Sequence, residues 1–112
     1  MLHDTRAYLA DMLKAANLIQ QFAAGKTFEQ MEADDLVRSA VYYQFAIIGE
    51  ALSQMKKIDE GTTDKISEAW RIIGFRNQIM HGYRVIRDAV TWQIIQDKLP
   101  ILKAELEGLL TT

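Results

Sequence analysis

The segment Arg76-Asn77-Gln78-Ile79-Met80-His81-Gly82-Tyr83 contains the side chains of this sequence that are best suited to chemistry. It places an arginine, a histidine and a tyrosine around one helical turn and its exit. A guanidinium matches the geometry of a phosphate group, and an imidazole gains and loses protons near neutral pH. These two groups are the minimum needed to cut a phosphodiester bond by acid–base catalysis.

Four of the six arginines lie in or beside this segment. Arg71, Arg76, Arg84 and Arg87 fall within 17 residues, and no acidic residue lies between Trp70 and Arg87. The whole chain has a formal charge of −2, so it is not a general nucleic-acid coat protein, which would be basic. Any contact with nucleic acid is therefore expected to be local. Arg71, Arg84 and Arg87 are candidate RNA contacts, with solvated loop charge as the alternative for the last two.

The spacing of Arg76 and His81 restricts how they act together. Five residues on a helix correspond to about 140° and about 7.5 Å, so the two side chains do not share a face. A bend at Gly74 would help one long arginine to reach a phosphate near His81, or the site could combine residues from two subunits. If Gly82 ends the helix, the dipole at His81 favours imidazolium, as suits a general acid for a leaving 5′-oxygen.

Each of these residues also has a structural alternative. His81 alone could be a helix-end histidine with a structural hydrogen bond. Arg76 could pair with Glu50, and a buried carboxylate there would orient the guanidinium without preventing catalysis. Tyr83 alone reads as an amphipathic tyrosine at a helix exit.

Length and composition indicate one domain over residues 1–112. The chain has no cysteine and no cluster of Asp, Glu and His suited to a metal, so we expect no metal site and no cofactor. No apolar run approaches the roughly 18 residues that a membrane span needs, and the first residues do not form a signal peptide. These features predict a cytoplasmic protein without membrane association.

Helical periodicity is strong along the chain, and strand patterns are nearly absent. A first helix is predicted from about Asp4, as N-cap, to about residue 24, with Gly25 as its stop. Thr27 and Gln30 read as a capping box that opens a short turn. A second long helix is predicted to start at residue 34 or 35, with an inward stripe of Val37, Val41, Phe45, Ile48, Leu52 and Met55.

Residues 42–52 are apolar almost all round, which indicates burial on more than one side and room for a second copy of the chain. We assign Tyr42, Tyr43, Trp70 and Trp92 to the core or to a dimer interface, and not to a base-stacking platform.

A third helix is predicted from Thr63, as N-cap, through Ile66, Trp70 and Ile73 to His81. Asp88 is predicted to cap the last helix, whose stripe continues to the end of the chain and which Pro100 should kink or divide. The inward stripe of this helix is Trp92, Ile95, Leu99, Leu102, Leu106 and Leu109. The expected fold is therefore an all-α, up-and-down bundle of four to five helices that dimerises through helix faces.

The pattern Arg-x4-His-x-Tyr, after an earlier helix with Ile47-Ile48-Gly49-Glu50-Ala51, resembles the HEPN superfamily. The nearest branch is similar to HepT, the toxin of the HEPN–MNT toxin–antitoxin pairs, a type VII-like system. The resemblance covers nearly the whole chain, including Thr27-Phe28-Glu29, Trp70 to Asn77, His81-Gly82-Tyr83 and Asp88 with Val90 and Trp92.

The resemblance implies a homodimeric, metal-independent ribonuclease with its site at the two-fold axis. Arg76 and His81 match the family's catalytic pair, and Asn77 matches its supporting polar residue. The resemblance also implies an MNT nucleotidyltransferase antitoxin that transfers AMP to Tyr83 and blocks the site by bulk and charge. Transfer RNA is the substrate that the family implies. The rival interpretation is a HEPN-like bundle without turnover, acting as a nucleotide-binding or scaffold partner of a nucleotidyltransferase.

Overall fold

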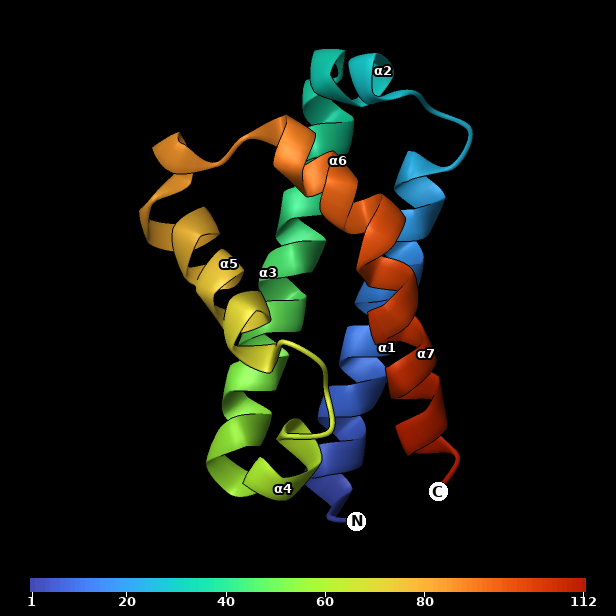
Figure 1. Ribbon diagram of the computed structural model, residues 1–112, viewed down its shortest axis with the longest axis vertical. Coiled ribbons are helices and arrows are strands. Elements are labelled where there is room, and N and C mark those ends of the chain that lie inside the picture. The colour runs from blue at the N-terminus through green and yellow to red at the C-terminus, as the bar shows by residue number, and fades with distance from the viewer.

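The computed structural model describes residues 1–112 and consists of helices that run alternately up and down (Figure 1). The long segments are α1 (His3–Ala23), α3 (Asp35–Ile58), α5 (Ala69–His81) and the pair α6 (Asp88–Asp97) and α7 (Leu99–Leu110). Short helices connect them: α2 (Phe28–Ala33), α4 (Glu60–Thr63) and the 3-10 turn η1 (Tyr83–Val85). The predicted all-α bundle is confirmed. No helix combines the length and apolar character that a bilayer span requires.

The ends of the first three helices follow local signals in the sequence. Gly25 takes a left-handed φ of 72° just after α1, a conformation that glycine adopts without steric cost. The predicted capping box opens α2, because Thr27 Oγ1 accepts from the Gln30 amide and Gln30 Oε1 accepts from the Thr27 amide. Asp34 caps α3 by accepting from the Val37 amide at 3.2 Å. These boundaries agree with the sequence prediction, whereas Asp4, predicted as the N-cap of the first helix, is the second residue of α1.

The helix that carries the motif begins later than predicted. It starts at Ala69, whereas Thr63 ends the short helix α4 and Ile66 lies buried in the connection. Glu68, just before α5, takes a left-handed φ of 55°, which resets the direction of the chain. Trp70 is consequently 69% exposed and does not belong to the inner stripe. The side chains of α5 that do pack against the core are Ala69, Ile72, Ile73, Phe75 and Ile79.

Proline divides the last helical segment, as predicted. α6 ends at Asp97, and Pro100 stands in the first turn of α7, where a missing N–H removes no helical hydrogen bond. The stripe predicted for this segment faces inward, with Ile95, Leu99, Leu102 and Leu106 buried and Trp92 and Leu109 partly buried. The chain therefore turns over the top of the bundle on α6 and returns beside α1 on α7 (Figure 1).

The hydrophobic core lies mainly between α1, α3 and α7. The predicted stripe of α3 is buried from Val41 to Met55, and α1 adds Leu9, Met12, Ala15, Ala16 and Ile19. α5 packs on α3 but contributes no fully buried residue. The motif helix is thus held to the bundle through one face only, and its other faces remain open.

A hydrogen-bonded aspartate joins the start of α1 to the end of α3. Asp59 accepts from the Thr62 amide at 3.1 Å, from Thr62 Oγ1 at 2.8 Å and from Thr5 Oγ1 at 3.0 Å. These bonds, above all those from Thr62, hold the pKa of Asp59 below its ordinary value. A lowered pKa means that the ionised carboxylate stabilises the fold above the unfolded pKa of about 3.9, and that this contribution disappears as pH falls through the folded pKa.

We expect Asp59→Asn to lower the free energy of unfolding at pH 7 and to have less effect near pH 3. Asparagine still caps a helix, so the variant should fold. Urea unfolding followed by circular dichroism at both pH values measures the difference. The control is Asp11→Asn, an exposed α1 residue, which should show no such pH-dependent gap. A gap for Asp59→Asn that stays constant between the two pH values would contradict the assignment.

Candidate functional site

Arg76 lies on α5 and reaches across to α3. Its Nη2 is 2.9 Å from Glu50 Oε2, and its Nη1 donates to Asn77 Oδ1 at 3.1 Å. Gln54, one turn further along α3, donates from Nε2 to the other Glu50 oxygen at 3.0 Å. The Arg76 guanidinium is therefore paired with the Glu50 carboxylate, which is itself hydrogen-bonded to Gln54. We call Gln54, Glu50, Arg76 and Asn77 the arginine array.

Glu50 differs in one respect from the orienting carboxylate considered in the sequence analysis. Its side chain is 48% exposed, not buried, while that of Arg76 is 26% exposed. Solvent screens a pair of this kind, so it adds little to stability. Its effect is geometric, because a bonded guanidinium has fewer orientations than a free one.

His81 is the last residue of α5, and Gly82 ends the helix as predicted. The His81 side chain is exposed and forms no hydrogen bond or ion pair in the structure. The structural alternative, a histidine tied down by a hydrogen bond, is therefore not what the structure contains. An exposed imidazole without a partner is free to meet a ligand.

The Arg76 and His81 side chains remain separated along α5. Both residues follow Gly74 on one unbroken helix, so a bend at that glycine would not shorten the distance between them. The expected benefit of a bend at Gly74 is therefore wrong. The other arrangement considered from the sequence, a site that combines residues from two copies of the chain, does not depend on such a bend.

The segment after His81 turns tightly and is anchored at Asp88. Tyr42 Oη of α3 donates to Asp88 Oδ1 at 2.6 Å and lies 2.9 Å from Thr91 Oγ1, while Arg38 Nε is 3.6 Å from Asp88 Oδ2. Burial, followed by the bond to Asp88, raises the pKa of Tyr42. Asp88 was predicted as an N-cap, but it is the first helical residue of α6 and makes no cap bond. Its carboxylate instead fixes the motif's exit to α3.

The anchored turn presents three exposed residues to solvent. Tyr83, Arg84 and Val85 form η1, and the Tyr83 side chain is 67% exposed. The Tyr83 hydroxyl has no hydrogen-bond partner in the structure, unlike the partly buried Tyr42 hydroxyl. Tyr83 is therefore accessible, two residues beyond His81.

The three arginines predicted to contact RNA are arranged differently from one another. Arg71 lies over the Trp70 ring at 5.0 Å and 3.5 Å from a Glu68 carboxylate oxygen. Arg84 and Arg87 are exposed and form no ion pair. The two arginines beyond His81 thus provide positive charge that no acidic residue of the chain neutralises.

Large apolar side chains are exposed on α3 and α5, the two helices that carry the arginine array. Tyr43 lies two turns before Glu50, and Trp70 lies two turns before Asn77, so each shares a helix face with a member of the array. The exposed fractions are 66% for Tyr43 and 69% for Trp70. Leu36 and Met80 are also exposed on these helices. By contrast, Tyr42 and Trp92 are partly buried, with Trp92 packed against Phe28.

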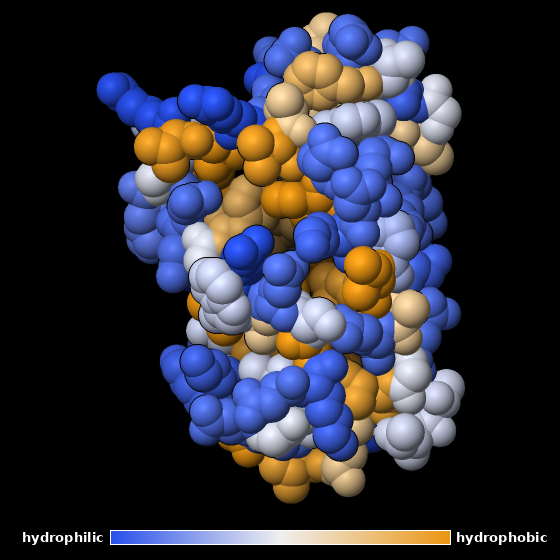
Figure 2. All heavy atoms as spheres, in the orientation of Figure 1, coloured by the Kyte–Doolittle hydropathy of each residue, from blue (hydrophilic) through white to orange (hydrophobic).

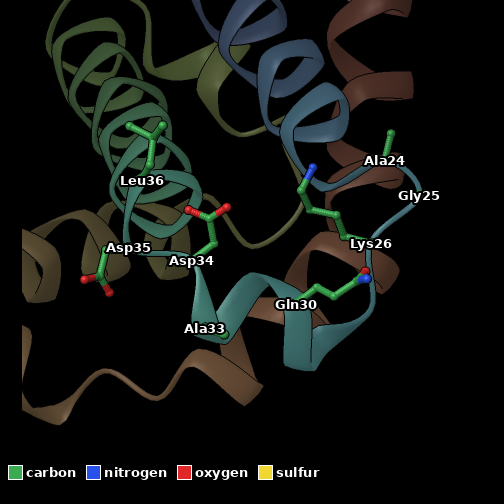
Figure 3. A pocket seen from close by; sticks show the side chains of 8 residues that line it. All are labelled: Ala24, Gly25, Lys26, Gln30, Ala33, Asp34, Asp35 and Leu36. Carbon is green, nitrogen blue, oxygen red and sulfur yellow. The ribbon is translucent and has the colours of Figure 1, made fainter.

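The hollows of the surface lie elsewhere. Figure 3 shows one of about 750 Å³ between the end of α1 and the start of α3, where Lys26 and Asp34 point into it. A second, of about 400 Å³, is an apolar groove between α5 and the α6–α7 segment, visible as an orange recess in Figure 2. Neither is lined by Arg76 or His81. No group of three His, Asp or Glu side chains is placed to hold a metal ion.

The arrangement is a helical bundle with an ordered arginine and an open histidine on one surface helix. The family model described as "Ribonuclease HepT-like" matches residues 12–109. The chain therefore belongs to the HepT-like ribonuclease family of the HEPN superfamily.

Relatives of similar length are described as ribonucleases. The chain is 29% identical over 106 residues to a putative RNase of Methanocaldococcus jannaschii, covering 93% of this chain and 94% of the relative. It is 28% identical over 110 residues to a probable ribonuclease HepT of Thermococcus cleftensis, covering 97% and 98%. A putative RNase of Caldanaerobacter subterraneus is 26% identical over 106 residues, covering 94% and 93%. No solved structure matches the chain significantly.

Proposed function

We propose that this chain is a metal-independent endoribonuclease in which Arg76 and His81 act on the scissile phosphate. The observation that carries the proposal is the contrast between them: Arg76 is held by Glu50 and Asn77, whereas His81 on the same helix is exposed and unpaired. A positioned cation and an available proton carrier are what phosphodiester cleavage requires. Membership of a ribonuclease family supports RNA as the substrate.

In the proposed reaction the 2′-hydroxyl oxygen attacks the adjacent phosphorus. The new bond joins phosphorus to O2′, and the bond from phosphorus to O5′ breaks, leaving a 2′,3′-cyclic phosphate and a 5′-hydroxyl. Arg76 stabilises the negative charge on the non-bridging oxygens, and Asn77 and Glu50 keep its guanidinium in place. One imidazole takes the proton from O2′, and another supplies a proton to O5′.

Two imidazoles imply two copies of the chain, and we propose a homodimer through the outer face of α3 and α5. Tyr43, Trp70 and Met80 are exposed within about two turns of the arginine array, and large apolar side chains exposed near one another are typical of an interface. A two-fold axis beside the arginine array would bring two His81 side chains to one phosphate. It would also compensate for the separation of Arg76 and His81 on α5.

We propose further that the chain is the toxin of a cytoplasmic toxin–antitoxin pair and acts on tRNA. Its partner would be a nucleotidyltransferase antitoxin that transfers AMP to the Tyr83 hydroxyl. The exposure of Tyr83 and its unpaired hydroxyl support this, as does its place beside His81. A phosphate attached there would occupy the neighbourhood of Arg84 and Arg87, which RNA would otherwise use.

Incubation of the purified, unmodified chain with total tRNA in EDTA tests the proposed function. Discrete fragments that end in 2′,3′-cyclic phosphate are expected, whereas a DNA oligonucleotide of matched sequence should stay intact because it has no 2′-hydroxyl. A folded chain that cuts no RNA would contradict the proposal. Binding of nucleotides without cleavage would then identify a binding or scaffold partner of the nucleotidyltransferase.

A further inference from the structure

Arg76 can reach Glu50 because the neighbouring α3 residue, Gly49, has no side chain to block the path. A Cβ built on Gly49 would lie far inside van der Waals contact with Arg76 Cβ, 2.8 Å from Arg76 Cγ and 3.3 Å from the Ile72 carbonyl oxygen. The buried glycine therefore makes room for the first carbons of the arginine side chain. The guanidinium then extends past α3 to the neighbouring Glu50.

The obstruction that a methyl group would create cannot be relieved by a rotamer change. The Cβ of Arg76 is attached directly to the α5 backbone, so α5 itself would have to move until the carbons stand about 3.5–4.0 Å apart. α5 can shift more easily than the helices of the core. It packs mainly on α3 alone and contributes no fully buried residue. A displacement of roughly 1.5 Å, which would carry the guanidinium away from Glu50, is the expected response.

The Glu50 carboxylate is held by a second residue of α3, Gln54. Gln54 lies one turn after Glu50 and donates Nε2–H to Glu50 Oε1 at 3.0 Å, which leaves Oε2 for Arg76. Without this bond, the exposed Glu50 side chain would be free to change rotamer. Gly49 thus determines how closely Arg76 approaches α3, and Gln54 determines the orientation of the Glu50 carboxylate.

We infer that Gly49 and Gln54 are positioning residues for the Arg76 guanidinium. The inference rests on the proposed ribonuclease function, in which that guanidinium binds the phosphate. Neither residue would contact the substrate, and both would act through Glu50 and Arg76.

Gly49→Ala is expected to lower kcat by at least about 10²-fold, because a misplacement of about 1 Å at a catalytic group already costs that much, with a much smaller change in KM. The matched control is Gly108→Ala on α7. It also adds a methyl group to a helical glycine, but no atom lies within 4 Å of the added carbon. Gly108→Ala should keep the wild-type kcat. Circular dichroism checks that all variants remain helical.

Gln54→Met keeps the length of the side chain and removes the donor to Glu50. We expect a loss in kcat of roughly threefold to tenfold, the size that one net hydrogen bond produces. This variant also tests the inference if Gly49→Ala fails to fold. The end of the Gln54 side chain is exposed, so its replacement does not disturb the core.

Nuclear magnetic resonance of the arginine side chains gives a second readout that does not need activity. In the wild type the Arg76 Hη protons should give separate signals at low temperature, because both Nη atoms are bonded; Arg76→Lys identifies them. The signals should merge in Gly49→Ala and broaden in Gln54→Met. Unchanged signals and unchanged kcat in both variants would overturn the inference. An inactive wild type would instead contradict the proposed function, while the signals still report on the positioning.

Discussion

His81→Ala is expected to reduce tRNA cleavage by about 10²- to 10⁴-fold, the range that a general acid or base contributes. The loss should appear in kcat, with RNA binding close to the wild-type level, because Arg76, Arg84 and Arg87 remain. The fold should also remain, since the imidazole is exposed and forms no hydrogen bond that alanine would break. Initial rates in EDTA, with circular dichroism and an RNA-binding titration on the same samples, measure all three quantities.

His3→Ala is the matched control for this experiment. His3 is the other histidine of the chain, and it is exposed at the first residue of α1. The His3→Ala variant should cleave tRNA at the wild-type rate. If His81→Ala keeps the wild-type rate while folded, the proposed role of His81 is wrong and a contaminating nuclease or another site is responsible.

Arg76→Lys is expected to lower kcat by about 10²- to 10³-fold, as the loss of one donor to the transition-state charge does. Lysine keeps the positive charge but loses the planar fork that bonds Asn77 and Glu50 at the same time. The free energy of unfolding should change little, because the pair with the half-exposed Glu50 is screened by solvent. Single-turnover cleavage and urea unfolding measure the two effects.

Arg6→Lys provides the comparison on a different helix. Arg6 on α1 donates to the Leu110 carbonyl oxygen at 2.9 Å, so it is also an arginine with a structural partner. It should leave the cleavage rate unchanged. If Arg76→Lys cleaves as fast as Arg6→Lys, the chemistry needs only a charge at residue 76, and the geometric role of the arginine array is contradicted.

Some features of the molecule follow from interactions within about four residues along the chain, and the sequence was enough to predict them. The capping box at Thr27, the cap at Asp34, the glycine stops and the division before Pro100 are of this kind. The inward stripes of α3 and of the α6–α7 segment follow from helical periodicity in the same way. The residues of the motif could likewise be named, because their types and spacing carry their chemistry.

Errors in the sequence analysis arose where the outcome depends on the surroundings. The left-handed Glu68 is not a glycine, and nothing in its neighbours marked it as the turn that begins α5. Trp70 was therefore included in the apolar stripe of that helix, although it lies on the open face. The alternative assignment of Trp70 to a dimer interface stays a prediction. Asp88 has the residue type of a cap, but the nearby Tyr42 hydroxyl on α3 offers its carboxylate a different partner.

The sequence alone was sufficient for the all-helical fold and most helix ends, because short-range interactions decide these, and residue chemistry was enough to propose Arg76, His81 and Tyr83 as site residues. The sequence offered Glu50 only as a possible partner of Arg76, and packing between helices decided that Glu50 holds the guanidinium. Glu50 and Arg76 are 26 residues apart in the chain, and they meet because Gly49 allows α5 to approach α3. The rotation and distance of one helix on another depend on the shapes of both surfaces at once, and these exist only in the folded chain.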